Sequence, residues 1–178
     1  MGELATFKDW YRYNALVRDL YLQRMFQLSA REQTRDRGAS FPSVRDIFLH
    51  VLDAYRYWFH HVAHSTGEDY RRYVEFAHSP KQIRQAVKET NELVFGYLDS
   101  LRESDLSKTI RATYTYKGKV YHRNIVTRDM LWHMVEEELQ HRGELNALFW
   151  QLDIDPPVWD WEDWKKNKER KPSIRRWH

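Results

Sequence analysis

Four long segments of the sequence repeat apolar residues every three or four positions, which is the spacing of one face of an α-helix. The segments cover residues 4–29, 43–62, 79–101 and about 127–152. Helices with one apolar face bury that face against one another. The pattern therefore predicts an all-α fold, a four-helix bundle.

Local signals mark where these helices begin and end. Ser43 stands three residues before Asp46 and resembles the start of a capping box, with Asp in place of Glu or Gln. Residues 79–82, Ser-Pro-Lys-Gln, supply a cap, a proline at the first helical position and a Gln that can reach back. Residues 155–157, Asp-Pro-Pro, stop the last helix. Residues 30–42 are predicted to form a loop.

Residues 109–121 break the helical pattern. Thr and Tyr alternate there before Lys117 and Gly118, and Val and Tyr follow. A period of two with a turn residue at its centre predicts a short β-hairpin. We expect it as an insertion before the last helix.

The composition limits the classes of protein to which the chain can belong. A length of 178 residues fits one domain, and 42% hydrophobic residues are enough for a core. The sequence has no cysteine, which excludes disulfides, thiolate metal sites and a cysteine nucleophile. It shows neither an export signal nor an apolar run long enough to span a membrane, so we expect a cytoplasmic protein without a membrane partner.

Positive charge is concentrated at the C-terminal end. Residues 165–178 hold seven of the 29 Lys and Arg residues but one of the 26 Asp and Glu residues. The rest of the chain lacks the basic surface that nucleic-acid binding needs, so we do not expect a nucleic-acid partner. We divide the chain into a bundle, residues 1–157, and a Trp- and basic-rich C-terminal extension, residues 158–178, whose indoles can lie on the bundle.

The last helix carries two polar residues on its apolar stripe. The stripe consists of Met130, Met134, Glu137, His141, Leu145, Leu148 and Leu152. A buried carboxylate needs a cation or hydrogen-bond donors. His141 follows Glu137 by one turn, so both side chains could reach one metal ion. Glu136 and Glu138 point to either side of the stripe, and we expect both to be solvated.

A third metal ligand is expected from a facing helix, and His50 lies on the apolar stripe of the second helix. Two imidazoles and one carboxylate would hold a divalent metal ion and leave one coordination position open, which is the ligand count of catalytic zinc. The same residues could instead form a buried hydrogen-bonded pair and a satisfied core histidine. The pattern alone leaves both interpretations open.

Other histidines carry weaker signals. His60 and His64 are four residues apart, but with His61 between them they stand at the end of the second helix, where we expect a solvated terminus. His133 lies one turn before Glu137, beside the stripe, and could act as a hydrogen-bond donor to a ligand or as a proton shuttle.

Three separated motifs agree in order and spacing over roughly residues 5–157. Residues 131–145, LWHMVEEELQHRGEL, followed by LDIDPP, resemble the last-helix signature of the DinB superfamily, in which His-Arg-Gly-Gln closes a metal-binding helix. Residues 43–50, SVRDIFLH, resemble its second-helix motif, and Tyr13-Asn14 matches a frequent pair in its first helix. Many members carry His at the position of Glu137, whereas the His/Glu/His version is similar to that of mycothiol-dependent isomerases and some other members.

The resemblance implies an up-down-down-up bundle in which His50, Glu137 and His141 bind the metal. The ligand types suit zinc, nickel, iron or manganese, and we expect zinc or nickel. It also implies a small-molecule substrate and either hydrolysis or transfer and isomerisation with a low-molecular-weight thiol as partner. In this hypothesis the ion lowers the pKa of a bound water or thiol, and His133 or Asn14 orients the nucleophile. Similar bundles are commonly homodimers, and we expect a homodimer here.

Other functions stay open at this point. A metal-binding, stress-associated protein without turnover would use the same three residues. A ferritin-like di-iron site would use the Glu-x-x-His pairs at Glu138 and Glu75, but further inward glutamates on the first and third helices are missing. The basic tail could bind nucleic acid. Whatever the function, we expect the substrate pocket to be shaped by Trp10, Trp58 and Trp132.

Overall fold

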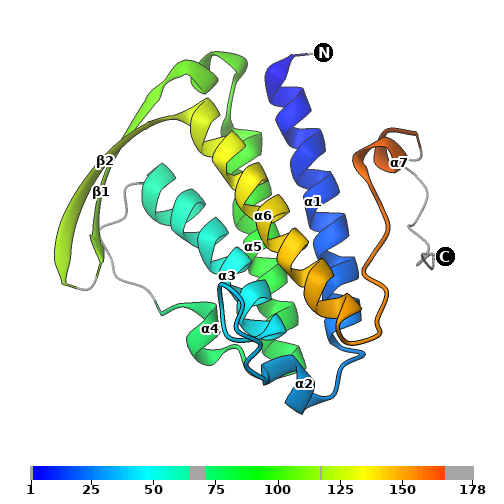
Figure 1. Cartoon of the computed structure of the whole chain (residues 1–178). Helices are drawn as coiled ribbons and strands as arrows, with labels where there is room; N and C mark the ends of the chain where they lie inside the picture. Colours follow the sequence, from blue (N-terminus) through cyan, green and yellow to red (C-terminus); the bar gives the residue numbers. More distant parts are fainter. Residues whose placement is uncertain (1, 65–70, 117, 167–178) are drawn as a thin grey trace.

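The computed structural model describes residues 2–64, 71–116 and 118–166, and four long helices form its centre. These are α1 (Glu3–Met25), α3 (Val44–Arg56), α5 (Pro80–Ser100) and α6 (Thr127–Trp150). The helices α1 and α6 run in one direction and α3 and α5 in the other (Figure 1). The predicted all-α bundle with up-down-down-up topology is confirmed.

Short helical elements join and extend the long ones. They are α2 (Ala30–Thr34), the π-helical turn η1 (Tyr57–Val62), α4 (Tyr73–Phe76), the 3₁₀ turn η2 (Glu103–Ser107) and α7 (Trp161–Lys166). Within the described part of the chain, no helix combines the length and the apolar character needed to cross a membrane.

The two predicted helix starts carry the expected caps. The side chain of Ser79 accepts a hydrogen bond from the amide of Gln82 at 3.3 Å, and the Gln82 side chain accepts one from the Ser79 amide at 3.0 Å. The hydroxyl of Ser43 accepts a hydrogen bond from the amide of Asp46 at 3.2 Å. These bonds satisfy amides that would otherwise lack a partner in the first turn of α5 and α3.

The first and last helices end earlier than their apolar patterns predict. The helix α1 ends at Met25, and Ser29 starts α2 inside the predicted loop, because its hydroxyl accepts a hydrogen bond from the amide of Glu32 at 3.2 Å. The helix α6 ends at Trp150, and Asp153 takes a left-handed conformation with φ 55°. A local cap and a left-handed residue stop a helix even where apolar spacing continues.

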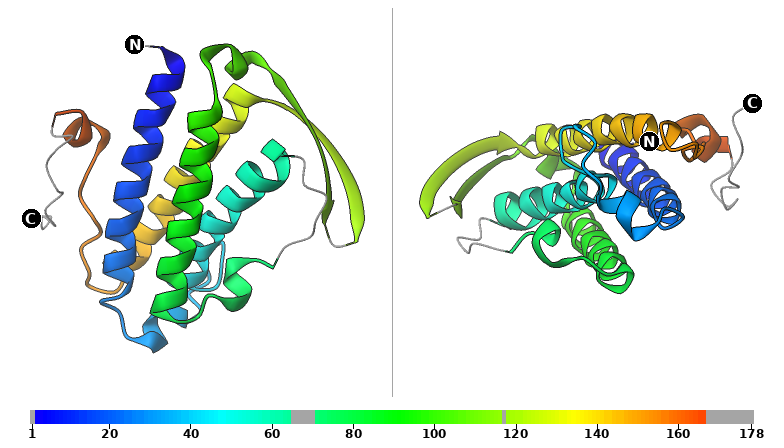
Figure 2. Two further views of the ribbon diagram at one scale, coloured as in Figure 1. Left: turned by 180° about the vertical axis from the view of Figure 1, so that it is seen from behind. Right: turned by 60° about the horizontal axis from the view of Figure 1, so that its bottom comes forward.

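The predicted hairpin is present and is longer than the sequence indicated. Its strands are β1 (Thr109–Tyr116) and β2 (Lys119–Val126), paired antiparallel so that Tyr114 faces Tyr121. Gly118 adopts φ 72° in the turn, a conformation that glycine takes without strain; Lys117, the other predicted turn residue, lies outside the described residues. The strand β2 continues to Val126 because β1 offers backbone partners down to Thr109. Figure 2 shows the hairpin and α7 on opposite sides of the bundle.

The hydrophobic core consists of two clusters, one toward each end of the bundle. Along α6, one cluster includes Val135 and the other begins again at Leu145. The buried residues of α6 between the two clusters are polar, namely Glu138, His141 and Arg142, and Asn14 and Arg18 of α1 are buried against them.

The prediction that Glu138 is solvated is wrong, because its side chain is buried with 2% exposure. The carboxylate accepts hydrogen bonds from Arg18 at 3.1 Å and Arg142 at 2.8 Å, and a third from the Tyr55 hydroxyl. Burial alone would raise the pKa of Glu138, but the two arginines lower it below its ordinary value. The physical reason for the error is that α6 packs against both α1 and α3 and therefore buries two neighbouring rows of residues.

The end of the second predicted helix is less solvated than expected. His64 is exposed, but His61 is buried with 3% exposure. The chain forms the π-helical turn η1 here, and this changes which side chains face the core. Phe59 and Val62 are fully buried in the same turn.

The described part of the C-terminal extension lies on the bundle. The ring of Trp161 stacks on Trp10 with centroids 4.0 Å apart, and the backbone oxygen of Trp159 accepts a hydrogen bond from Tyr13 at 2.9 Å. Trp159 and Trp164 are buried. The indoles thus pack as the sequence suggested, whereas most of the basic run, residues 167–178, lies outside the described residues. The domain boundary at residue 157 stays a prediction.

Candidate metal centre

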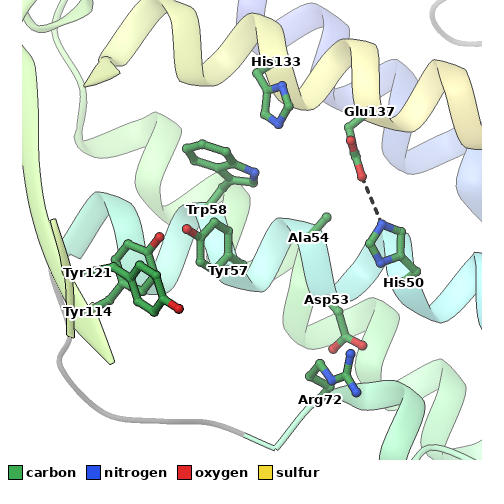
Figure 3. A pocket seen from close by; sticks show the side chains of 10 residues that line it. All are labelled: His50, Asp53, Ala54, Tyr57, Trp58, Arg72, Tyr114, Tyr121, His133 and Glu137. Carbon is green, nitrogen blue, oxygen red and sulfur yellow. Dashed lines mark hydrogen bonds and ion pairs between the residues drawn. The ribbon is translucent and has the colours of Figure 1, made fainter. Parts of the chain in front are cut away.

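The packing of α3 against α6 brings His50, Glu137 and His141 together. The Nε2 atom of His50 lies 3.0 Å from Oε1 of Glu137, and Nε2 of His141 lies 3.3 Å from the same oxygen. One possible ligand atom from each of the three residues lies within 4.8 Å of the others. Figure 3 shows His50 reaching from α3 toward Glu137 on α6.

The two distances to Glu137 are near those between ligand atoms that share one divalent ion. Bonds of about 2.0–2.2 Å around a tetrahedral ion place neighbouring ligand atoms roughly 3.2–3.6 Å apart. Both the 3.0 Å and the 3.3 Å separations come close to that range. The donor set of two imidazole nitrogens and one carboxylate suits zinc, nickel, iron or manganese and leaves a coordination position for another molecule.

His141 is oriented by a partner that the sequence pattern did not single out. Its Nδ1 atom lies 2.6 Å from a carboxylate oxygen of Glu144, one turn further along α6. The Glu144 carboxylate in turn accepts hydrogen bonds from the hydroxyl of Ser40 at 2.7 Å and from its amide at 3.3 Å. The carboxylate on Nδ1 fixes the imidazole with Nε2 directed at Glu137, and a carboxylate in this position would also orient a metal-bound histidine. The spacing of three residues between His141 and Glu144 was the signal available in the sequence.

His50 is held by an aromatic contact from the segment before α3. The ring of Phe41 stacks on the imidazole of His50 with centroids 3.9 Å apart and an interplanar angle of 25°. The same phenyl ring lies edge-on to His141 at 5.8 Å. The segment that the sequence predicted as a plain loop therefore supports both histidines.

The three residues are electrostatically suited to a cation. Hydrogen bonds from His141 and His50 hold the pKa of Glu137 far below its usual value, although partial burial opposes this. The hydrogen bond with Glu137 raises the pKa of His141; burial opposes the rise, and the bond with Glu144 adds to it. Glu137 is therefore ionised at neutral pH and favours positive charge at this point.

A cavity of about 470 Å³ lies beside the three residues. His50 and Glu137 line it together with eight other residues, Asp53, Ala54, Tyr57, Trp58, Arg72, Tyr114, Tyr121 and His133. A volume in the range of roughly 300–1,000 Å³ is typical of small-molecule sites. The candidate metal centre thus opens onto a space large enough for a small substrate.

His133 lies where the sequence predicted, beside the candidate metal centre. It stands on α6 one turn before Glu137 and faces the cavity (Figure 3). Its imidazole lies edge-on to the ring of Trp58, with centroids 4.9 Å apart, and its side chain is 39% exposed. This exposure lets the imidazole exchange protons with water or with a molecule in the cavity.

The structure does not bring Asn14 to this cavity. Its side-chain oxygen accepts a hydrogen bond from Arg142 at 2.9 Å, its nitrogen donates one to the Tyr55 hydroxyl at 3.4 Å, and the residue is fully buried. The role of orienting a nucleophile, expected from the sequence for Asn14, has no geometric support. The physical reason is that Asn14 lies on the face of α1 that packs against the buried rows of α6.

Of the three tryptophans expected around the ion, Trp58 alone lines the cavity. Trp10 stacks on Trp161, and Trp132 packs against Phe7 with ring centroids 4.9 Å apart. The expectation for Trp10 and Trp132 was wrong, because Trp10 on α1 packs on Trp161 of α7 and Trp132 on α6 packs against Phe7 of α1.

The surroundings of Glu138 argue against the di-iron alternative. Glu138, which would pair with His141 in that site, is bound to Arg18 and Arg142. His50, Glu137 and His141 form the one group of three or more potential ligands found among the described residues.

Comparisons with known proteins agree with this architecture. A model of the DinB family matches residues 1–172, which includes residues after 157 for which the sequence motifs gave no counterpart. Among solved structures, a DinB-like protein from Bacillus cereus ATCC 10987 is similar, with a TM-score of 0.61 and 12% identity over 85% of this chain and 95% of that chain. At this identity the likeness shows the fold alone. The comparison with curated proteins gives no match.

Proposed function

The chain belongs to the DinB family, and from this premise we propose that it is a metal-dependent enzyme acting on a small molecule in the cavity beside His50, Glu137 and His141. The observation that carries the proposal is that ligand atoms of these three residues, within 4.8 Å of one another, adjoin a cavity of about 470 Å³. The reaction is hydrolysis or a transfer that uses a low-molecular-weight thiol. A storage or purely structural ion would not need such a space.

When bound, a divalent ion supplies Lewis acidity, which lowers the pKa of a water or thiol at its open position. Zinc or nickel is the metal we propose, with iron or manganese as the alternatives, since the ligand types suit all four. The absence of cysteine from the chain means that any reacting thiol comes from a second substrate.

Side chains around the candidate metal centre have separate roles in the proposed reaction. Glu137 contributes the negative charge that holds the cation, and Glu144 keeps Nε2 of His141 directed at it. His133 faces the cavity and can accept a proton from the attacking group and return it to the leaving group. Phe41 covers the side of His50 on which its ring stacks and limits the access of water there.

Metal content is the first test of this proposal. Elemental analysis of gently purified protein is expected to find about one zinc or nickel ion per chain, the stoichiometry of a single three-residue site. Glu137→Ala is expected to lose this metal. Glu136→Ala is the matched control, because Glu136 neighbours Glu137 on α6 with a side chain that is 75% exposed. Equal metal content in both variants would contradict the site, and two ions per chain would revive the di-iron alternative.

Turnover is the second test. Zinc-loaded protein is mixed with a nitrophenyl ester without thiol, and with a chloronitrobenzene in the presence and absence of cysteine. Hydrolysis of the ester supports the hydrolase, and thiol-dependent loss of chloride supports the transferase. Either activity should fall by a factor of roughly 10² to 10⁴ in His133→Ala, the usual contribution of a general acid or base, while metal content stays constant. Inactivity in every arm, with unfolding on chelation, would instead support a structural ion.

A further inference from the structure

One end of the cavity has an aromatic wall built from two distant parts of the chain. Tyr57 and Trp58 come from η1, and Tyr114 and Tyr121 come from the hairpin (Figure 3). The rings of Tyr114 and Tyr121 stack with centroids 5.5 Å apart, and Tyr57 lies edge-on to Tyr114 at 5.4 Å. The four rings therefore form one continuous surface along the cavity.

The register of the hairpin explains why its tyrosines lie on this surface. Successive residues of a strand point to opposite faces, so Tyr114 shares a face with Ala112, which is 2% exposed against the bundle. Tyr121 is the cross-strand partner of Tyr114 and lies on the same face. Val120, on the opposite face, is 63% exposed. The face that anchors the hairpin to the bundle thus continues outward as the wall of the cavity.

The charged side chains of the cavity lie at its other end. Asp53, Arg72 and Glu137 stand around His50, away from the hairpin tyrosines (Figure 3). Asp53 already accepts hydrogen bonds from the amides of Tyr73 at 2.6 Å and Val74 at 3.2 Å. The cavity is therefore polar where a metal would bind and aromatic at the opposite end.

The aromatic end is suited to a neutral ring and not to a cation. The guanidinium carbon of Arg123 lies 4.2 Å over the ring of Trp58, and Arg123 donates a hydrogen bond to the Tyr57 hydroxyl at 3.4 Å. Burial and a hydrogen bond with Tyr114 raise the pKa of Tyr57 to about 12, so the phenol stays neutral. A cationic ligand would meet the positive charge of Arg123 at this end and of the metal at the other.

We infer that the substrate carries a neutral planar aromatic group, which binds between the tyrosines of the hairpin and η1 while its reactive group reaches the metal centre. Tyr114 and Tyr121 are then specificity-determining residues. Aromatic rings gain from stacked and edge-on contacts beyond the burial of their surface. The inference deepens the proposed function and rests on it, because the reactive group is oriented by the metal.

Two hydroxamates that differ by a ring test this inference. Acetohydroxamate and benzohydroxamate carry the same metal-chelating group, and only benzohydroxamate carries a phenyl ring. Titration of the zinc-loaded full-length protein by calorimetry is expected to show benzohydroxamate binding at least about tenfold more tightly, the gain typical of a buried ring with one or two aromatic contacts. The double variant Tyr114→Ala with Tyr121→Ala is expected to lose this advantage and to bind acetohydroxamate unchanged.

Two further variants test whether the preference for benzohydroxamate depends on the aromatic rings of the cavity wall. Val120→Ala alters the outer face of the same strand and is expected to keep the full preference. Tyr121→Leu preserves the bulk of the side chain but not the ring, so it is expected to lose part of the preference with an unchanged circular dichroism spectrum. Equal affinity of wild type for the two hydroxamates, or displacement of benzohydroxamate by tetramethylammonium, would overturn the inference.

The experiment distinguishes failure of the aromatic site from failure of the proposed function. If zinc does not bind, or if neither hydroxamate binds to the zinc-loaded protein, the open metal centre is refuted. If acetohydroxamate binds and the phenyl ring adds nothing, the metal centre stands and the aromatic site is refuted.

Discussion

His141 makes polar contacts through both of its ring nitrogens, and these contacts orient its imidazole in the candidate metal centre. Its Nδ1 lies 2.6 Å from Glu144 and its Nε2 lies 3.3 Å from Glu137. Because Glu144 is held by Ser40, the imidazole has little freedom to turn away from Glu137. Ser40, in the segment between α2 and α3, therefore helps to position His141 through Glu144.

Removing the carboxylate of Glu144 should weaken metal binding without removing a ligand. Glu144→Ala is expected to lower the zinc affinity roughly 10- to 100-fold, the usual effect of losing a partner that orients a metal-bound histidine. A competition assay with a fluorescent zinc chelator measures the affinity, with Glu136→Ala as the control. An affinity equal to that of wild type would show that Glu144 does not orient His141.

The protonation of His141 should make metal binding dependent on pH. Since hydrogen bonds to Glu137 and Glu144 raise the pKa of His141, its imidazole holds a proton at pH values where an ordinary histidine is already neutral. That proton must leave before Nε2 can bind the ion, so zinc affinity should rise as pH increases from about 6 to 8. In Glu144→Ala the midpoint should move to lower pH, because one cause of the raised pKa is gone. The same competition assay, repeated across this range, checks the direction, and a midpoint that moves upward would contradict it.

At the scale of elements, the bundle is joined across its middle by charge as well as by apolar packing. Glu138 on α6 binds Arg18 on α1 and Arg142 one turn away, and it accepts a hydrogen bond from Tyr55 on α3. The guanidinium of Arg18 also lies 4.4 Å from the ring centre of Tyr55. This polar group fixes how the three helices are rotated relative to one another, and that rotation directs Glu137 and His141 toward α3.

Breaking this group should destabilise the whole bundle. Glu138→Ala leaves two buried guanidinium groups without their carboxylate and is expected to lower the free energy of unfolding by roughly 3–5 kcal/mol. Urea unfolding of the metal-free protein measures the change. Glu136→Ala, two residues away and exposed, is expected to unfold like wild type. A loss below about 1 kcal/mol, the size of a surface effect, would show that the pairing is not needed for stability.

At the scale of the whole molecule, the described part of the C-terminal extension, residues 158–166, packs on the bundle. Trp161 lies flat on Trp10 with an interplanar angle of 3°, and Lys165 forms an ion pair with Asp9 at 3.3 Å. Both contacts attach α7 to α1, on the side of the bundle opposite the hairpin (Figure 2). The contacts of residues 158–166, the described part of the extension, lie away from the candidate metal centre, and we expect them to add stability.

Loss of the Trp161 ring should lower stability and leave metal binding intact. Trp161→Ala is expected to cost about 1–3 kcal/mol, from the lost stacking and buried area. Trp150→Ala provides a matched control, because Trp150 is 52% exposed at the end of α6. Thermal unfolding and zinc affinity are measured on both variants. A reduced zinc affinity in Trp161→Ala alone would show that the extension supports the metal centre after all.

The sequence by itself predicted the features of this protein that depend on residues close together in the chain. The four helices, the caps at Ser43 and Ser79 and the hairpin depend on the spacing of apolar residues and on hydrogen bonds between near neighbours. The pairing of Glu137 with His141 is local too, because two residues four apart on a helix always share a face. The choice of His50 as third ligand needed the family motif as well, since apolar spacing alone left a satisfied core histidine equally open.

Only the tertiary structure determined how these elements pack and which of their side chains meet. How far α6 is rotated between α1 and α3 determined that Glu138 is buried and Asn14 is kept from the cavity. The support of the histidines by Ser40 and Phe41, and the aromatic wall at Tyr114 and Tyr121, join residues far apart in the chain. Spacing along a helix fixes the directions of side chains relative to that helix alone. Their surroundings depend on helix rotation and loop path, which follow from the packing of the entire core.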